Sequence, residues 1–283
     1  MNKSLKSPLR YAGGKSRAIY KLHEFCPDMS KMTHYSEPFL GGGSMAIYMT
    51  KTYPHLNISV YDNYIPLICF WLELRDNCEE LQETLKSLMV LQDSMPDPKD
   101  MFLTAKNVLK KLNPIHAPPH ICCNPTEIAS AFYLVNKQCF GGVMTGGFSR
   151  GAYERNWNDN QINNLKLYSD LIKNWDIHCK DYTSCCNYWP PWMRDRLIYC
   201  DPPYLINSHL YSGHSAFNKE VDAFWKWCKR TNCPILISYN NVKTPLDDEP
   251  EFKRSIFDLK YSMVTQGEKY DKDGKEVVIW SGY

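Results

Sequence analysis

Short apolar runs of β-prone residues alternate with longer helical stretches over much of the chain. The clearest runs are residues 57–62, 196–200 and 234–238. This alternation predicts an α/β fold with a largely parallel sheet. Ligands of such sheets bind beyond the carboxyl ends of the strands, which is where the loop after Phe39, the side chain of Asp62 and the segment from Asp201 would lie.

The middle and the end of the chain have different patterns. Residues 255–265 and 276–280 flank a turn-rich segment, which predicts an antiparallel hairpin that closes the sheet. Between about residues 65 and 164 the alternation gives way to helix-prone sequence broken by prolines, with a glycine-rich far end at residues 140–151 that predicts a mobile loop or hairpin. We therefore expect one α/β domain, residues 1–64 and 165–283, interrupted by a mainly helical insertion, residues 65–164.

The composition is that of an ordinary globular protein. Of the 283 residues, 43% are hydrophobic and 23% are charged, and 33 Lys and Arg balance 31 Asp and Glu. No stretch resembles a signal peptide or is apolar for long enough to span a bilayer, so we expect an intracellular protein that does not enter a membrane. The 12 cysteines are expected to be reduced. We predict no metal site, because His116, His120, Cys122 and Cys123 lack a second CxxC partner.

Local charge is more informative than the net charge of +2. Basic residues are frequent in the first segment, and Lys106, Lys110 and Lys111 fall on a predicted helix. Both groups could follow a phosphate backbone. Taken alone, each group is better explained by a solvated surface.

A glycine-rich loop near the start of the chain predicts a nucleotide-like ligand. Phe39, Gly41 and Gly43 precede a helix-compatible segment, so backbone could approach a ligand where a side chain would clash. Asp62 follows about twenty residues later, the spacing of an acid that binds ribose hydroxyls. NAD and S-adenosylmethionine both fit this half of the site. A P-loop does not fit, because Leu9 occupies the position of its leading glycine.

The second motif, Asp201-Pro202-Pro203-Tyr204, predicts the reaction. The Asp201 carboxylate and the Pro202 carbonyl can accept both hydrogens of an exocyclic amino group, and Tyr204 offers a face for a planar base. The nitrogen lone pair is then directed at an electrophile. This arrangement favours methyl transfer by positioning and electrostatics.

Three segments in this order resemble the Dam-type (D12 class) DNA adenine-N6 methyltransferases: Tyr-Ala-Gly-Gly-Lys at residues 11–15, FxGxG at residues 39–43 and Asp-Pro-Pro-Tyr at residues 201–204. The resemblance covers most of the chain. It implies a Rossmann-like class I methyltransferase sheet with a C-terminal antiparallel hairpin, in which residues 65–164 form a target-recognition, DNA-binding insertion. The remaining residues would form the catalytic domain.

The resemblance also implies roles for particular residues. The residues expected to bind S-adenosyl-L-methionine are Tyr11, Lys15, Phe39, Gly41, Gly43, Asp62, Asp181, Tyr182 and Asp201. Those expected to act in catalysis on a flipped adenine are Asp201, Pro202, Pro203 and Tyr204. Tyr11 replaces the tryptophan of the best-known members, and no arginine precedes Arg150 in the glycine-rich recognition loop, so their recognition sequence does not transfer.

The expected partner is double-stranded DNA, bound by a monomer or weak dimer that needs no other protein. Polar and cationic residues are the candidates for contact with phosphates and base edges. These are Lys6, Asn136, Lys137, Arg150 and Arg155. Two alternatives stay open: methylation of cytosine N4, and a catalytically inert DNA-binding protein of the same fold. Methylation of protein glutamine is disfavoured, because that motif begins with asparagine.

Overall fold

The structure is a computed structural model that describes residues 5–11, 15–112, 124–186, 194–203, 217–240, 244–260 and 273–283. Its strands are β1 (His34–Glu37), β2 (Asn57–Asp62), β3 (Asp176–Cys179), β4 (Arg196–Cys200), β5 (Ile235–Asn240), β6 (Lys253–Lys260) and β7 (Asp273–Ser281). Its α-helices are α1 (Ile19–His23), α2 (Ser44–Thr52), α3 (Ile65–Asp76), α4 (Cys78–Asp93), α5 (Lys99–Lys111), α6 (Pro125–Gln138), α7 (Arg150–Asn156), α8 (Asp159–Asn163), α9 (Leu165–Ile172) and α10 (Phe217–Arg230).

The described strands form one sheet in the order β3-β2-β1-β4-β5-β7-β6. β3, β2, β1, β4 and β5 are parallel to one another, whereas β7 runs antiparallel between β5 and β6. The predicted α/β class is therefore confirmed. The C-terminal hairpin is also confirmed, and it places the reversed strand inside the sheet, in the manner of a class I methyltransferase.

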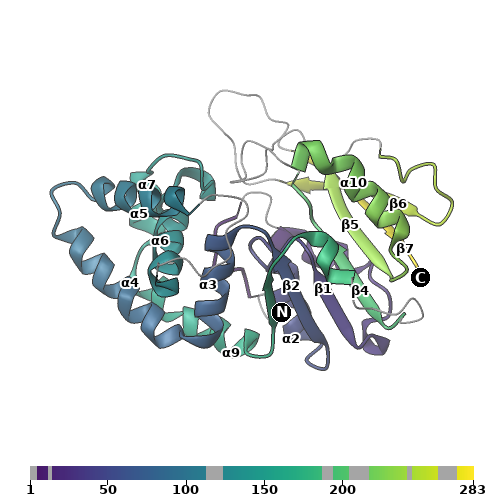
Figure 1. Ribbon diagram of the computed structural model, residues 1–283, viewed down its shortest axis with the longest axis horizontal. Coiled ribbons are helices and arrows are strands. Elements are labelled where there is room, and N and C mark those ends of the chain that lie inside the picture. The colour runs from purple at the N-terminus through teal and green to yellow at the C-terminus, as the bar shows by residue number, and fades with distance from the viewer. Residues whose placement is uncertain are drawn as a thin grey trace.

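Alternate residues of the central strands belong to two separate cores. Leu197 and Tyr199 of β4 pack into a large core with α1, α2, α3 and α9, and Ile198 and Cys200 pack into a second core with α10. A strand directs successive side chains to opposite faces, and every residue of β4 is buried because both faces of the sheet are covered there. Figure 1 shows α10 lying over the strands that the C-terminal part of the chain forms, beside β5.

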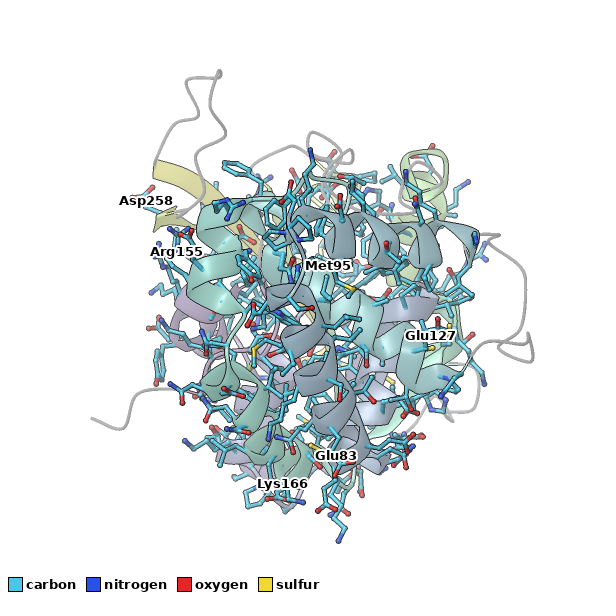
Figure 2. The ribbon with its side chains drawn as sticks, turned by 90° about the vertical axis from the view of Figure 1, so that its left-hand side faces the viewer. Glu83, Met95, Glu127, Arg155, Lys166 and Asp258 are labelled. Atoms are coloured by element: carbon cyan, nitrogen blue, oxygen red, sulfur yellow. The ribbon has the colours of Figure 1, made fainter. Side chains whose placement is uncertain are left out.

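The chain between β2 and β3 is helical in its described residues. α4, α5, α6 and α7 form a lobe beside the sheet, at the left of Figure 1, and Figure 2 views this lobe face on. The predicted insertion, residues 65–164, begins at the first residue of α3 and ends one residue after α8. Its glycine-rich end is a short hairpin bridged between Cys139 and Phe148, after which α7 starts at Arg150.

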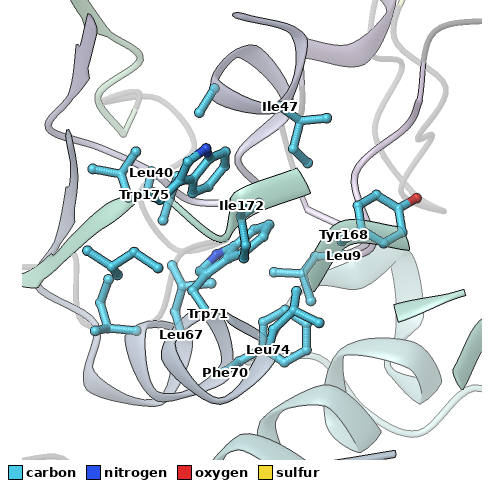
Figure 3. Close-up of a cluster of buried hydrophobic side chains, with 14 of the residues drawn as sticks. Leu9, Leu40, Ile47, Leu67, Phe70, Trp71, Leu74, Tyr168, Ile172 and Trp175 are labelled. Carbon is cyan, nitrogen blue, oxygen red and sulfur yellow. The ribbon is translucent and has the colours of Figure 1, made fainter. Parts of the chain in front are cut away.

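α6 is the central helix of the lobe. Asn124 caps its first turn by accepting from the Thr126 amide at 3.0 Å, and Pro125 occupies a position where no amide hydrogen is needed. From Thr126 to Gln138 every residue except Glu127 is buried. The large core continues from this helix through α3 to the sheet, as the cluster around Phe70, Trp71 and Trp175 shows (Figure 3).

Within the described part of the chain, no helix is long and apolar enough to cross a membrane. The same residues contain no group of histidine, cysteine and acidic side chains arranged to hold a metal ion. His116, His120, Cys122 and Cys123 lie outside the described residues.

Candidate active site

Four acidic side chains lie toward the carboxyl edge of the parallel strands. Glu37 ends β1, Asp62 ends β2, and Asp201 directly follows β4. Glu276 belongs to the antiparallel strand β7 and pairs in register with Asn240, the last residue of β5. The sheet therefore gathers carboxylates from segments that are far apart in the sequence.

The loop after β1 is shaped by Gly41. Its φ angle of +46° lies in the left-handed region, and a Cβ there would come within 2.9 Å of Tyr11 Cε1. The Gly41 amide donates to Asp62 Oδ2 at 3.0 Å, and its carbonyl accepts from Trp71 Nε1 at 3.2 Å. The loop backbone is thus held between a carboxylate, an indole and the ring of Tyr11. Gly43 follows as the residue before α2.

Asp62 is a buried carboxylate that accepts hydrogen bonds from backbone amides. Besides the Gly41 amide, it accepts from the Tyr64 amide through Oδ1 at 3.0 Å. Burial raises the pKa of Asp62, and the backbone hydrogen bonds oppose that shift. The Asn63 amide is a third backbone donor to this carboxylate. A carboxylate offers about four lone-pair positions, so these bonds leave limited acceptor capacity for a ligand.

Lys15 is buried between two carboxylates, those of Asp201 after β4 and Glu276 on β7. Its ammonium lies 2.7 Å from Asp201 Oδ1 and 3.5 Å from Glu276 Oε1, and only 3% of the Lys15 side chain is exposed. Ser238 of β5 donates to the same Glu276 oxygen. Asp201 is 23% exposed, so the network has a buried anchor and one accessible carboxylate.

Glu37 has a different electrostatic environment. It accepts from the Tyr35 hydroxyl at 3.1 Å and is buried. Burial raises the pKa of Glu37 well above its usual range; the Tyr35 hydrogen bond opposes this, and the nearby charges of Asp201 and Asp62 add to it. Burial therefore disfavours the charged form of Glu37 relative to a carboxyl group in water.

Aromatic rings from three segments meet at this edge, on the face of the sheet that α10 covers. Phe39 stacks on Tyr182 with ring centroids 5.4 Å apart and planes 22° apart. Phe224 of α10 meets both rings edge on, each at a centroid distance of 5.6 Å. The neighbouring Asp181 is exposed and accepts from the amide and the hydroxyl of Thr183.

The structure brings the predicted cofactor and catalytic residues to one edge of the sheet as far as it describes them. Pro202 and Pro203 are buried directly after Asp201. Tyr204 lies outside the described residues. The sequence analysis missed Glu276 and Ser238. For Glu276, the available signal was a single acidic residue at the start of the apolar run in β7.

Asn136 and Lys137, which we predicted to contact DNA, are buried inside the lobe, so their side chains are not accessible to DNA in this structure. Asn136 accepts from the Arg10 amide at 2.9 Å and donates to the Arg10 carbonyl at 2.6 Å. The Arg10 guanidinium in turn donates to the carbonyls of Lys137 and Cys139 at 3.1 and 2.8 Å. A cation in this place also suits the C-terminal end of α6.

Lys137 points toward the N-terminal segment. Its ammonium donates to the Pro8 carbonyl at 2.6 Å and to Gln161 Oε1 at 3.2 Å, and it lies 4.9 Å from the centre of the Tyr133 ring. Burial, with a smaller contribution from Arg10, lowers the pKa of Lys137 to about 7. Asn136 and Lys137 therefore fix residues 8–10 against the end of α6.

The other three predicted DNA contacts are accessible. Lys6, Arg150 and Arg155 are exposed. Arg150 lies 3.7 Å from Asp97 in a pair that is open to solvent on both sides. Figure 2 shows Arg155 near the upper edge of the helical lobe.

Comparison with known proteins agrees with this geometry. "Type II methyltransferase M.MjaIII" of Methanocaldococcus jannaschii is 27% identical over 213 residues, which cover 71% of this chain and 69% of that protein. "Type II methyltransferase M.CviBI" of Paramecium bursaria Chlorella virus NC1A is 23% identical over 260 residues, which cover 86% and 87%. The family model of the D12 class N6 adenine-specific DNA methyltransferases matches residues 11–268. The chain therefore belongs to the D12 class N6 adenine-specific DNA methyltransferases.

Proposed function

We propose that this enzyme transfers the methyl group of S-adenosyl-L-methionine to N6 of an adenine flipped out of double-stranded DNA. The family supports site-specific adenine methylation of DNA. The cofactor, the flipped base and the residues that hold them are our assignment. We expect the enzyme to act inside the cell as a monomer or weak dimer.

The residues at the carboxyl edge fit S-adenosyl-L-methionine. The loop at Gly41 presents backbone without a side chain, and Asp62 has acceptor capacity suited to ribose hydroxyls. Tyr11, Phe39 and Tyr182 supply aromatic faces on either side of the loop. When bound, the cofactor supplies an electrophilic methyl group. We assign Lys15, Gly43 and Asp181 to the same site.

Asp201 and Pro202 are assigned to the adenine amino group. The Asp201 carboxylate accepts one N–H and the Pro202 carbonyl accepts the other, which leaves the nitrogen lone pair directed at the methyl group. Lys15 holds Oδ1 of Asp201, so the carboxylate has a fixed orientation before the base arrives. Pro203 shapes the same turn, and Tyr204 keeps its predicted role as a stacking surface.

The helical insertion is assigned to DNA. Lys6, Arg150 and Arg155 are the exposed cations proposed to contact its phosphates or bases. Extruding one base from a duplex costs about a few kcal/mol. Contacts made by the insertion would offset that cost.

The observation that carries this proposal is the fixed, accessible carboxylate of Asp201 beside the Gly41 loop. Its test is incubation of the enzyme with labelled S-adenosyl-L-methionine and unmethylated DNA, followed by nucleoside analysis. We expect N6-methyladenine from the wild type and from Asp258→Ala, a control that removes an exposed acid from β6. Asp201→Ala should form at least about 100-fold less.

The products distinguish the alternatives. N4-methylcytosine would overturn the choice of base. DNA binding without any methylated base would identify an inert DNA-binding protein. Equal activity of Asp201→Ala and Asp258→Ala would contradict the assignment of Asp201.

A further inference from the structure

The glycine-rich end of the insertion has a defined conformation. We call residues 139–148 the recognition hairpin, because they are bridged between Cys139 and Phe148. The Phe140 amide donates to the Gly147 carbonyl at 3.0 Å, and the Gly146 amide donates to the Val143 carbonyl at 2.8 Å. These two backbone bonds close the hairpin.

The base of the recognition hairpin is fixed by packing. Gly142 has a φ angle of +75°, and a Cβ there would lie 2.7 Å from the Arg10 carbonyl oxygen, so the hairpin lies directly on the N-terminal segment. On its other strand, Phe148 meets Phe102 of α5 edge on, with ring centroids 5.6 Å apart. Neither contact reaches the apex.

Lys106 of α5 reaches the apex. Its ammonium donates to the Thr145 carbonyl at 2.9 Å and to the Gly146 carbonyl at 2.5 Å. The same ammonium lies 5.7 Å from the centre of the Phe102 ring. Lys106 is half-buried, and burial together with the charge of Lys110 lowers its pKa. Two of its three hydrogens are therefore used inside the protein rather than offered to solvent.

We propose that Lys106 is a positioning residue that holds the apex of the recognition hairpin and thereby sets the sequence preference of methylation. This inference rests on the proposed function, in which the insertion reads DNA. Phe140 and Thr145 are exposed on the hairpin. The position of the apex relative to α5 therefore determines which of the hairpin's groups can reach a base edge. Hydrogen bonds to base edges tolerate little displacement.

The competing role for Lys106 is a direct phosphate contact, as its neighbours on α5 could make. Lys111 provides the matched control, because it belongs to the same helix, carries the same charge and is exposed. Loss of a phosphate contact weakens binding to all sequences and lowers the salt slope by about 1. Loss of a tether changes the preference among sequences instead.

The first experiment compares Lys106→Ala, Lys106→Arg and Lys111→Ala on a randomised DNA library with base-resolved methylation mapping. We expect Lys106→Ala to relax the preference about 10-fold at one or more positions of the target. Lys106→Arg should restore it, because arginine can donate to both carbonyls. Lys111→Ala should keep the wild-type preference at every salt concentration, and any loss of methylation should be equal for all sequences. The same result with Lys106→Ala, a uniform loss with an unchanged preference, would overturn the proposal.

A second measurement needs no DNA. Amide hydrogen exchange of the recognition hairpin should become at least about 10-fold faster in Lys106→Ala than in the wild type, while α6 keeps its protection as evidence of folding. Unchanged exchange in the hairpin would overturn the tether. A wild type that tethers the hairpin but methylates no DNA would overturn the proposed function, and with it the sequence-preference part of this inference.

Discussion

The two glycine-rich loops of the molecule both contain glycine at positive φ but have different surroundings. Gly41 and Gly142 both adopt positive φ, and both lie against the same N-terminal segment, one on the Tyr11 ring and the other on the Arg10 carbonyl. The Gly41 loop faces the carboxylate of Asp62 and aromatic rings, whereas the recognition hairpin is held by the cations of Arg10 and Lys106. Glycine spacing thus specifies the shape of a loop, while neighbours from distant segments specify its chemistry.

The N-terminal segment joins the two loops. Ser7 donates to the Gly42 carbonyl, and three residues later Arg10 is bonded to Asn136. Residues 7–11 therefore contact both the proposed cofactor site and the proposed DNA site. A substitution at a residue that contacts one loop should therefore affect that loop alone. A substitution that releases residues 7–11 from α6 should affect both loops.

The largest effect is expected from Lys15→Ala, which acts on the cofactor side alone. It removes the cation shared by Asp201 and the buried Glu276, and breaking a buried pair costs about 3–5 kcal/mol. We expect single-turnover methylation to fall about 100-fold or more, with the mapped target sequence unchanged. The control is Lys21→Ala, which removes an exposed cation paired with Glu24. Activity of Lys15→Ala within tenfold of the control would contradict this role.

Asn136→Ala should affect both loops. It removes two hydrogen bonds to the Arg10 backbone in a buried position, so we expect the free energy of unfolding to fall by about 3 kcal/mol. The affinities for S-adenosyl-L-methionine and for DNA should weaken together, as calorimetry on the folded protein would measure. Asn107→Ala, an exposed change on α5, should alter neither. Weakened DNA binding with unchanged cofactor binding would show that the two loops are independent.

Lys137 gives the N-terminal contact a pH dependence. The pKa of Lys137 is lowered to about 7 in the folded protein from an unfolded value of 10.5, so the unfolded chain binds the extra proton between these values. The stability contributed at this site therefore rises as pH increases from 7 toward 10.5. In urea unfolding, the stability of Lys137→Met relative to wild type should fall by about 2 kcal/mol from pH 7 to pH 9.

The matched control for that titration is Lys166→Met, at an exposed position labelled in Figure 2. Its stability relative to wild type should be nearly constant over the same range. A constant difference for Lys137→Met as well would mean that Lys137 stays protonated in the folded protein throughout.

The smallest effect is expected from Tyr11→Ala. Loss of the ring against Gly41 should weaken binding of S-adenosyl-L-methionine about tenfold, since an aromatic contact contributes about 0.5–1.5 kcal/mol beyond its buried area. Tyr11→Phe keeps the ring and should bind nearly as tightly as the wild type. Equal loss in both variants would assign the effect to the hydroxyl instead.

Much of the cofactor side could be predicted from the sequence. Two strands, β2 and β4, have the bounds that their apolar runs predicted, and the Gly41 loop and Asp201 follow strands as expected. This succeeded because parallel strands place consecutive strand ends at one edge. Glu276 was missed because its partner Lys15 comes from the opposite end of the chain, and no local pattern reports such a pair.

The DNA side was harder to predict. Asn136 and Lys137 are polar and sit at the end of a helix, where polar residues are usually exposed. They are buried because the N-terminal segment, 126 residues from Asn136 in sequence, covers the end of α6. The sequence placed Lys106 on a charged helix face. Its two carbonyl partners lie about 40 residues away, and no local pattern indicates a contact over that separation.

We propose that one loop binds the cofactor, that the other reads DNA, and that residues 7–11 contact both. Hydrogen exchange of the wild type with each ligand alone separates these roles. We predict that S-adenosyl-L-methionine protects residues 38–43 more than the recognition hairpin, that duplex DNA carrying the mapped target does the reverse, and that both ligands protect residues 7–11. Protection of the recognition hairpin by the cofactor alone, with residues 38–43 unchanged, would show that these roles are wrongly assigned.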